Sequence, residues 1–321
     1  MNPKISVITP IFNVQTHIAK CVHSLLSQTL ENVEYIFIDD ASRDNSIGIL
    51  KQVISNYAHR QADVKIIELR ENVGVTAARE LAYQACSGEY IIHCDSDDWI
   101  ESTMLSDMYE HAIKNNADIV YCDFYIETEH ASIPHRATRF SSNHRQMVKN
   151  YIGSSLCVLW NKLIKKELYQ NIPFPTHIPY GEDINMTIKM MHKANNIAYL
   201  PKHLYHYNKK NSLSITNNLS ERTMQGELDC MEDLYYYFAS NNDNVYEKEL
   251  CWRILKAKQE WILNPQHHSK FMAYLPNSHK HILSCPFINK KLKIMMWCLT
   301  HHLAFVTASI LHIRKIKNRI L

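Results

Sequence analysis

A short apolar stretch that ends in a cluster of carboxylates constrains this chain more than any other feature. The run Tyr90–Ile92 has the composition of a strand buried on both faces, and the acidic turn Asp95–Asp98 follows it closely. Three carboxylates within four residues repel one another unless a positive group lies among them. A divalent cation with oxygen ligands, Mg²⁺ or Mn²⁺, would meet that need and would in turn hold a substrate phosphate. The alternative is an acidic turn that only caps the helix expected from about Thr103.

The composition is that of a folded globular protein, because 46% of the 321 residues are hydrophobic and 21% are charged. The formal net charge of +3 is too small to indicate a nucleic-acid partner. Nine scattered cysteines form no CxxC pair and no spacing typical of a metal site, which suits buried thiols in a reducing cytosol. The chain enters a strand-like segment at Ile5, so we expect no signal peptide and a cytoplasmic protein.

Strand-like and helix-like segments alternate through the first hundred residues. The apolar runs at 5–9, 33–38, 64–69 and 90–92 predict strands, and the amphipathic segments at about 16–28, 42–57 and 75–86 predict helices. This rhythm is typical of right-handed βαβ units, so we expect an α/β fold with a parallel sheet.

Polar side chains follow three of these predicted strands. Asn13 comes after the first strand, Asp39 and Asp40 after the second, and the acidic turn 95–98 after the fourth. Ligands of parallel α/β sheets bind at the carboxyl ends of the strands. The sequence therefore predicts that a polar, phosphorylated ligand binds along this edge.

The remainder of the chain is less regular. A helix with an apolar face precedes a strand-like run at 118–126, residues 127–143 have the polar composition of a loop, and a helix is expected after Asp183. Short strands are expected at 199–200 and 204–207, and the pattern is helical from about Leu219.

Seven segments of the chain stand in the order of the motifs of glycosyltransferase family 2, and the chain resembles that family over roughly residues 4–214. The segments are SVITPIFNV (6–14), IDDASRDNS (38–46), ENVGVTAAREL (71–81), SGEYIIHCDSDDW (87–99), WNKLIKKEL (160–168), GED (181–183) and YHYNKKNSLS (205–214). The resemblance implies an inverting, nucleotide-sugar-dependent enzyme of the GT-A fold. That fold is a Rossmann-like, mostly parallel sheet flanked by helices, here with a helical C-terminal extension.

The resemblance implies a pocket for the nucleotide. In it, Pro10, Phe12 and Asn13 would line the base pocket, and Asp40 would accept a hydrogen bond from the uracil ring N–H. Arg79 would lie against the base or its phosphate. Core packing of Phe12 and a surface ion pair of Arg79 are the alternatives.

The acidic turn would form the metal site of the same enzyme. Asp95, with Ser96 beside it, would lie near the ribose and the metal, and Asp97 would ligate Mn²⁺ or Mg²⁺ directly. His206 is a further candidate metal ligand, and Lys209 is a candidate cation for the diphosphate. The family more often has arginine where this chain has Asn208, so Lys210 is an alternative to Lys209.

Asp183 matches the catalytic base of the family. One carboxylate must take a proton from the acceptor hydroxyl as that hydroxyl attacks the anomeric carbon. At a helix start the helix dipole favours the ionised carboxylate, which suits a base. Glu182 is the rival for this role, and simple N-capping is the alternative for Asp183.

Two nearby side chains could complete the sugar site. Trp160 could offer an apolar face to a sugar ring or could belong to the core. Lys162, with Asn161 beside it, could reach the donor sugar or the acceptor.

The expected organisation is a glycosyltransferase domain over residues 1–215, with a nucleotide-binding half at 1–100 and an acceptor half at 101–215, followed by a helical region at 216–321. Residues 292–313 are mostly apolar and lie between two basic clusters. The tail at 290–321 could therefore lie on an anionic membrane surface, span the membrane or pack on its own domain. Peripheral membrane contact would suit a lipid-linked acceptor.

The leading hypothesis is a glycosyltransferase that moves a sugar from a UDP-sugar to a glycan or lipid-linked oligosaccharide, in the synthesis of a cell-surface polysaccharide such as lipopolysaccharide or capsule. A sugar nucleotidyltransferase would be expected to have a glycine-rich loop after the first strand, but the first glycine is Gly48. A non-catalytic carbohydrate-binding protein would have no use for Asp95, Asp97 and Asp183 together.

Overall fold

The computed structural model describes residues 3–138, 140–153, 157–210, 221–241, 243–303, 305 and 307. The chain divides into two compact units. The N-terminal unit contains Met1–Tyr151 with Leu156–Leu219, and the C-terminal unit contains Ile152–Ser155 with Ser220–Leu321.

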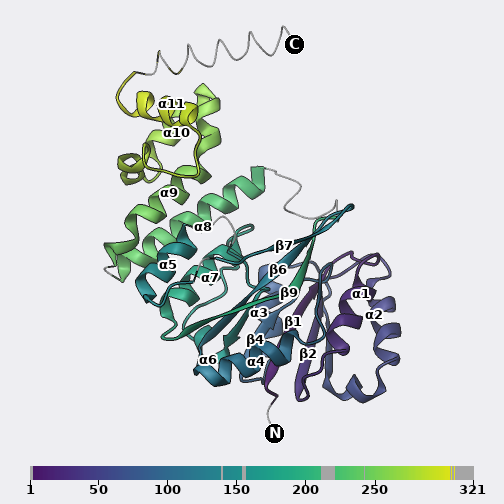
Figure 1. Ribbon diagram of the computed structural model, residues 1–321. Helices are drawn as coiled ribbons and strands as arrows, with labels where there is room; N and C mark the ends of the chain where they lie inside the picture. The colour runs from purple at the N-terminus through teal and green to yellow at the C-terminus, as the bar shows by residue number, and fades with distance from the viewer. Residues whose placement is uncertain are drawn as a thin grey trace. The chain divides into compact units, whose positions relative to one another are not determined.

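The N-terminal unit is built on one mixed sheet with helices around it (Figure 1). Its first half is the parallel arrangement β3-β2-β1-β4, with β1 at Ile5–Ile11, β2 at Val33–Asp39, β3 at Val64–Glu68 and β4 at Tyr90–His93. All residues of β2 and β4 are buried, as their near-continuous apolar composition predicts. The alternation of strands and helices expected from the sequence is confirmed here.

Helices cover this parallel half of the sheet. They are α1 (Ile18–Leu26), α2 (Ser46–Ser55), α3 (Val75–Gln84) and α4 (Met104–Asn115), with a 3₁₀ segment, η1, at Ala58–Asp63. Apolar residues of α1, α2 and α4 pack in one core cluster with β1, β2 and β4, whereas α3 contacts β1 and β2 outside that cluster. Because α3 starts at the carboxyl edge of these strands, its first turns lie beside the acidic turn.

The second half of the sheet continues beyond β4 in the order β8-β6-β9-β5. The strands are β5 (Trp99–Ile100), β6 (Ile119–Glu127), β8 (Lys162–Lys165) and β9 (Ile197–Asn208). β8 runs antiparallel to β4 and β6, whereas β6 and β9 are parallel. The two short strands expected at 199–207 are parts of the single strand β9, which shifts register against β6 near Asp123.

The expectation of a loop throughout 127–143 is wrong in part. Ser132–His135 form β7, which pairs antiparallel with β6. All four residues of β7 are exposed. Besides the backbone pairing, Ser132 Oγ donates to Glu127 Oε1 at 2.6 Å and the His135 ring lies 4.8 Å from that of Phe124. The polar sequence has no alternating pattern that predicts a strand.

Three further helices flank this half: α5 (His144–Ile152), α6 (Lys166–Tyr169) and α7 (Glu182–Lys193). Gly181 precedes α7 with a φ of 92°, a backbone conformation that strains residues with a side chain. This turn allows Glu182 and Asp183 to occupy the first turn of α7.

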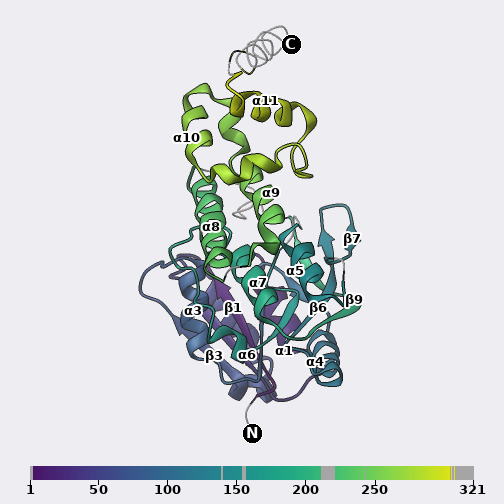
Figure 2. The same ribbon diagram turned by 90° about the vertical axis from the view of Figure 1, so that its left-hand side faces the viewer.

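The C-terminal unit is described as helices and 3₁₀ turns, coloured green to yellow in Figure 2. The helices are α8 (Glu221–Ser240), α9 (Glu247–Ala257), α10 (His268–Ala273) and α11 (Lys290–Thr300). The 3₁₀ turns are η3 (Asn244–Tyr246), η4 (Gln259–Leu263), η5 (Pro265–His267) and η6 (Pro276–His281). No helix within the described ranges is long and apolar enough to cross a bilayer. The proposed membrane tail is residues 290–321, and most of its residues after 303 lie outside those ranges.

Candidate active site

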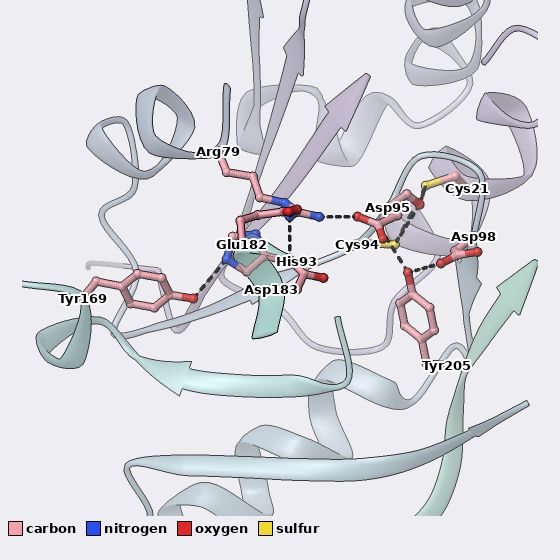
Figure 3. Close-up of polar contacts among 10 residues, drawn as sticks. All are labelled: Cys21, Arg79, His93, Cys94, Asp95, Asp98, Tyr169, Glu182, Asp183 and Tyr205. Atoms are coloured by element: carbon pink, nitrogen blue, oxygen red, sulfur yellow. Dashed lines mark hydrogen bonds and ion pairs between the residues drawn. The ribbon is translucent and has the colours of Figure 1, made fainter. Parts of the chain in front are cut away.

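Arg79 gathers three carboxylates that are far apart in the sequence. Its guanidinium donates to Asp95 Oδ1 at 2.8 Å, to Glu182 Oε1 at 2.9 Å and to Asp183 Oδ1 at 2.7 Å (Figure 3). Arg79 comes from α3, Asp95 from the end of β4, and the other two from the start of α7. One side chain therefore joins the acidic turn to the candidate base.

This cluster is buried, and burial changes its electrostatics. Arg79 is 3% exposed. Although burial alone would lower the pKa of Arg79, the three carboxylates raise it, so the guanidinium stays charged. Its contacts with Asp95, Glu182 and Asp183 place it beside the acidic turn.

Burial raises the pKa of Asp183 to about 7, although Arg79 acts against this shift; Glu182 and Asp95 add to it. The helix dipole was expected to favour the ionised carboxylate, but desolvation outweighs it. A carboxylate that titrates near pH 7 can accept a proton during turnover more readily than an ordinary aspartate. Its side chain is 20% exposed, so a substrate hydroxyl can still reach it.

Asp98 holds the acidic turn against β9. Its Oδ2 accepts a hydrogen bond from Tyr205 Oη at 2.6 Å, and its Oδ1 accepts one from the Asn208 backbone N–H at 2.7 Å. Asn208 also donates its side-chain amide to the Asp97 carbonyl at 3.0 Å. Burial, together with the charges of Asp97 and Asp95, raises the pKa of Asp98 well above its usual range. Asp98 therefore positions its neighbours.

The acidic turn has the donors that a hard divalent cation requires. Asp95 is partly exposed, at 28% of its side chain, and Asp97 is also only partly buried. Two carboxylates plus phosphate oxygens are the usual protein-and-substrate ligand set of Mg²⁺ or Mn²⁺. The effect of Asp95 and Asp97 on the pKa of Asp98 shows an accumulation of negative charge that a cation would relieve. These residues fit the expected metal.

His206, the further candidate metal ligand, lies between two carboxylates in this structure. Its Nδ1 lies 2.8 Å from Glu127 Oε1 and its Nε2 lies 2.9 Å from Glu101 Oε1. The ring also stacks on Trp99 and Tyr125, with centroids 5.1 and 4.8 Å away. Both nitrogens are therefore engaged by carboxylates, and the imidazole braces β9 against β5 and β6.

A pocket of about 590 Å³ opens at the carboxyl edge beside β2. Its lining includes Phe12, Asn13, Asp39 and residues 41–43 and 68–72. Phe12 is 47% exposed there, so its ring is available to a flat ligand. Pro10 precedes the pocket, within β1 and opposite Ile38.

Asp39 is one of the residues that line this pocket, and Asp40 is not among them. Asp40 accepts backbone hydrogen bonds from Val73 at 2.6 Å and Gly74 at 2.9 Å, one on each oxygen. In this structure the Asp40 carboxylate therefore fixes the loop before α3. The side-chain oxygens of Asp39 accept from the Ser42 backbone N–H, at 3.1 and 3.3 Å.

Asn13 shapes the mouth of the pocket. Its side-chain Oδ1 accepts from the Arg43 backbone at 2.8 Å, and its own N–H donates to Ser42 Oγ at 3.1 Å. Asn13 has a φ of 52°, which asparagine tolerates better than most residues. It therefore connects the loop after β1 to the loop after β2.

Trp160 lies in the core, which is the second of its two interpretations from the sequence, and Lys162 is also buried. Trp160 is 3% exposed and stacks on Tyr205 at 4.2 Å between centroids. Lys162 is 1% exposed, and its Nζ donates to the Val158 carbonyl and to Asn161 Oδ1. Burial lowers the pKa of Lys162 to about 8. Neither side chain has a free face for a ligand.

The remaining predicted residues lie near the acidic turn or at the edge of the described chain. Ser96 is buried within the turn at 6% exposure. Lys209 follows β9 and is exposed, with its backbone N–H donating to the Glu127 carbonyl at 2.9 Å. Lys210 is also exposed, and its N–H donates to Asn208 Oδ1.

The sequence-based prediction of the site did not include two residues that contact each other beside it, His93 and Tyr169. His93 precedes the acidic turn on β4, and its Nε2 lies 3.0 Å from Tyr169 Oη. Burial, with Arg79 adding to it, lowers the pKa of His93 well below its usual value, so the imidazole is neutral. A histidine within an otherwise apolar strand was a signal for a buried polar contact.

The comparison with protein-family models decides the family. The model described as glycosyl transferase family 2 matches residues 6–181, which is more than half of the chain. The chain belongs to this family. The match covers the chain from β1 to β8 with the acidic turn, and it ends at Gly181, immediately before α7.

Curated relatives and solved structures agree with this assignment. EpsJ of Bacillus subtilis (strain 168), an uncharacterized glycosyltransferase, is 30% identical over 67% of this chain and 64% of its own length. Poly(ribitol-phosphate) beta-N-acetylglucosaminyltransferase TarP of Staphylococcus aureus (strain N315) is 28% identical over 90% of this chain and 84% of its own. The crystal structure of S. aureus TarS 1-349 in complex with UDP-GlcNAc has a TM-score of 0.65 and 18% identity, and covers 94% of this chain and 88% of that one. The last likeness supports the GT-A fold. The matched part of this chain spans less than two thirds of the length of EpsJ.

Proposed function

We propose that this protein transfers a sugar from a UDP-sugar to a glycan or lipid-linked acceptor, with inversion, in the synthesis of a cell-surface polysaccharide. The observation that carries the proposal is the ion-pair cluster of Arg79, which joins Asp95 of the acidic turn to Asp183 at the start of α7. A group-transfer enzyme needs its phosphate-binding and proton-accepting groups this close together.

In this mechanism the nucleotide binds at the pocket beside β2. Phe12 offers its ring to the uracil, and Asp39 accepts the hydrogen bond from the ring N–H. The diphosphate extends toward Asp95 and Asp97, which would hold Mg²⁺ or Mn²⁺, and the ion supplies positive charge against the diphosphate. The partly exposed carboxylate of Asp95 is held in place by Arg79.

Asp183 accepts the proton of the acceptor hydroxyl as the hydroxyl oxygen bonds to the anomeric carbon. The bond from that carbon to the UDP oxygen breaks, and UDP leaves with the electron pair. Because base and leaving group lie on opposite faces of the sugar, the product has the inverted anomeric configuration. Arg79, which also pairs with Glu182, holds the Asp183 carboxylate in the cluster.

The names of the relatives support this substrate class. TarS was crystallised with UDP-GlcNAc, and TarP is named as a transferase acting on poly(ribitol-phosphate). We propose the same class of substrates for this chain, namely a UDP-sugar donor and a surface-polymer acceptor. The specific sugar and polymer are left open.

Incubation with a panel of nucleotide-sugars tests the proposal, with released nucleoside diphosphate as the readout. Release of UDP with a glycan or lipid-linked acceptor is expected. Release of pyrophosphate from a nucleoside triphosphate and a sugar phosphate would indicate a nucleotidyltransferase instead. Binding without turnover across the panel would indicate a carbohydrate-binding protein.

UDP binding should depend on a divalent cation and should fail in Asp97→Ala. The diphosphate must approach the negatively charged acidic turn, and only a cation makes that approach favourable. Calorimetric titration of UDP in Mn²⁺ and in excess chelator measures the effect. Glu101→Gln removes an exposed carboxylate that bonds His206, and it should leave UDP affinity unchanged. Undiminished affinity in chelator would contradict the assignment.

Asp39→Asn should weaken UDP binding by roughly 10- to 100-fold, since a hydrogen bond to a charged group contributes about 1.5–3 kcal/mol. Asp40→Asn should instead lower the thermal midpoint, because it loses a backbone acceptor for the loop at 73–74. Affinity and melting measurements on both variants separate the two roles. Weaker UDP binding in Asp40→Asn together with a lower thermal midpoint in Asp39→Asn would instead assign base recognition to Asp40.

We place the enzyme at the inner face of the cytoplasmic membrane, with the tail at 290–321 as its contact. The support is the basic residues on both sides of the apolar run at 292–313. A lipid-linked acceptor would be presented at that surface.

A further inference from the structure

Three side chains of metal-ligand type converge in the C-terminal unit, and none of them has a role assigned above. Glu247 and Cys251 are one turn apart on α9, and His281 ends η6. One ligand atom from each, the carboxylate oxygen, the thiol sulfur and an imidazole nitrogen, lies within 4.8 Å of the other two. α9 and η6 pack against each other, so the cluster ties together segments about 30 residues apart.

None of the three side chains has a hydrogen bond or an ion pair with any residue that the structure describes. Cys251 is fully buried at 0% exposure, whereas Glu247 and His281 are partly buried. Polar groups that leave water normally find a partner. The three groups face one another closely enough to share one metal ion.

We propose that Glu247, Cys251 and His281 bind one Zn²⁺ ion. Thiolate, imidazole and carboxylate together form a ligand set of Zn²⁺, whereas Mg²⁺ and Ca²⁺ take oxygen ligands. Zinc bonds of about 2.0–2.3 Å require only a small contraction of the cluster. The partial exposure of Glu247 and His281 leaves a fourth position for water.

The ion would act as a cross-link within the C-terminal unit. It would fix η6 to the first turns of α9, and its binding free energy would add to the stability of the unit. Burial and the Glu247 charge raise the pKa of the Cys251 thiol to about 12, so the metal-free thiol is protonated at pH 7. Binding must therefore release a proton.

Cobalt is the sharpest probe, because a thiolate bound to Co²⁺ has a charge-transfer absorption in the near ultraviolet that a carboxylate site lacks. The full-length protein is treated with chelator, freed of it, and titrated with Co²⁺ and then with Zn²⁺. We expect the absorption to saturate at one equivalent of Co²⁺, to disappear as Zn²⁺ displaces it, and the thermal midpoint to rise with Zn²⁺. Asp97→Ala should leave this absorption unchanged, which separates the cluster from the acidic turn.

Cys251→Ser should abolish the absorption, and His281→Gln should weaken binding by at least about 10- to 100-fold, the loss seen when even an outer-shell partner of a metal is removed. Cys298→Ser is the matched control, since Cys298 is another buried cysteine of the same unit. The serine is nearly isosteric, and the partly exposed His281 gives a second variant that should fold normally. Absence of the absorption, or its persistence in Cys251→Ser at unchanged affinity, would overturn the proposal. Neither readout depends on transferase activity.

Discussion

Asp183→Asn should reduce sugar transfer by about two to four orders of magnitude, the usual contribution of a positioned general base. UDP-sugar affinity should change little, because the donor is held by the pocket beside β2 and by the acidic turn. Asparagine is nearly isosteric and can still accept one hydrogen bond from Arg79. Steady-state transfer and calorimetric binding of UDP-sugar, measured on the same preparation, separate the two effects.

The pH dependence of transfer gives a second readout of the same residue. The pKa of Asp183 is raised to about 7, so the carboxylate is mostly protonated below that pH and ionised above it. A base must be ionised, and transfer should therefore rise as the pH increases through about 7. Asp183→Asn should lose this rise along with most of its activity.

Glu182→Gln is the matched control. Glu182 contacts the same guanidinium at 2.9 Å, but it does not accept the proton of the acceptor hydroxyl in this mechanism. Its substitution should cost much less than Asp183→Asn. A fully active Asp183→Asn, or a product that retains the anomeric configuration by NMR, would contradict the mechanism.

The parallel half of the sheet was predictable because its signals are local. Each strand from β1 to β4 is a short apolar run, and each crossover helix has its own amphipathic pattern. The mixed half was not predictable, because the antiparallel return of β8 between β4 and β6 is a pairing between distant segments. No local pattern specifies which neighbour such a strand takes.

The motifs that form the candidate site could be predicted from the sequence, but the position of each side chain within the site could not. Asp39 and Asp40 are adjacent, yet consecutive side chains at a strand end point to opposite sides, so only one of them lines the pocket. Trp160 and Lys162 could not be placed from sequence, since their burial depends on Tyr205 and Tyr151 from other segments. The contacts of His206 could not be predicted either, because the two carboxylates beside its ring are more than 75 residues away in the sequence.

Arg79→Gln should lower the free energy of unfolding of the N-terminal unit by about 3–5 kcal/mol, the usual effect of breaking a buried ion pair by removing one partner. The reason is that Asp95, Glu182 and Asp183 would be left close together without a counter-charge. Transfer should be lost as well, because the turn and the base would no longer be held together. Denaturant unfolding monitored by intrinsic fluorescence measures the stability change.

Two further variants make this expectation specific. Arg145→Gln removes an exposed arginine of α5 and should change the stability by less than about 0.5 kcal/mol. Arg79→Gln combined with Asp183→Asn removes one of the three uncompensated charges, so the double variant should be more stable than Arg79→Gln alone. If the double variant were less stable by the sum of the two single effects, Arg79 and Asp183 would be independent. The ion-pair cluster would then not be the feature that joins the acidic turn to the base.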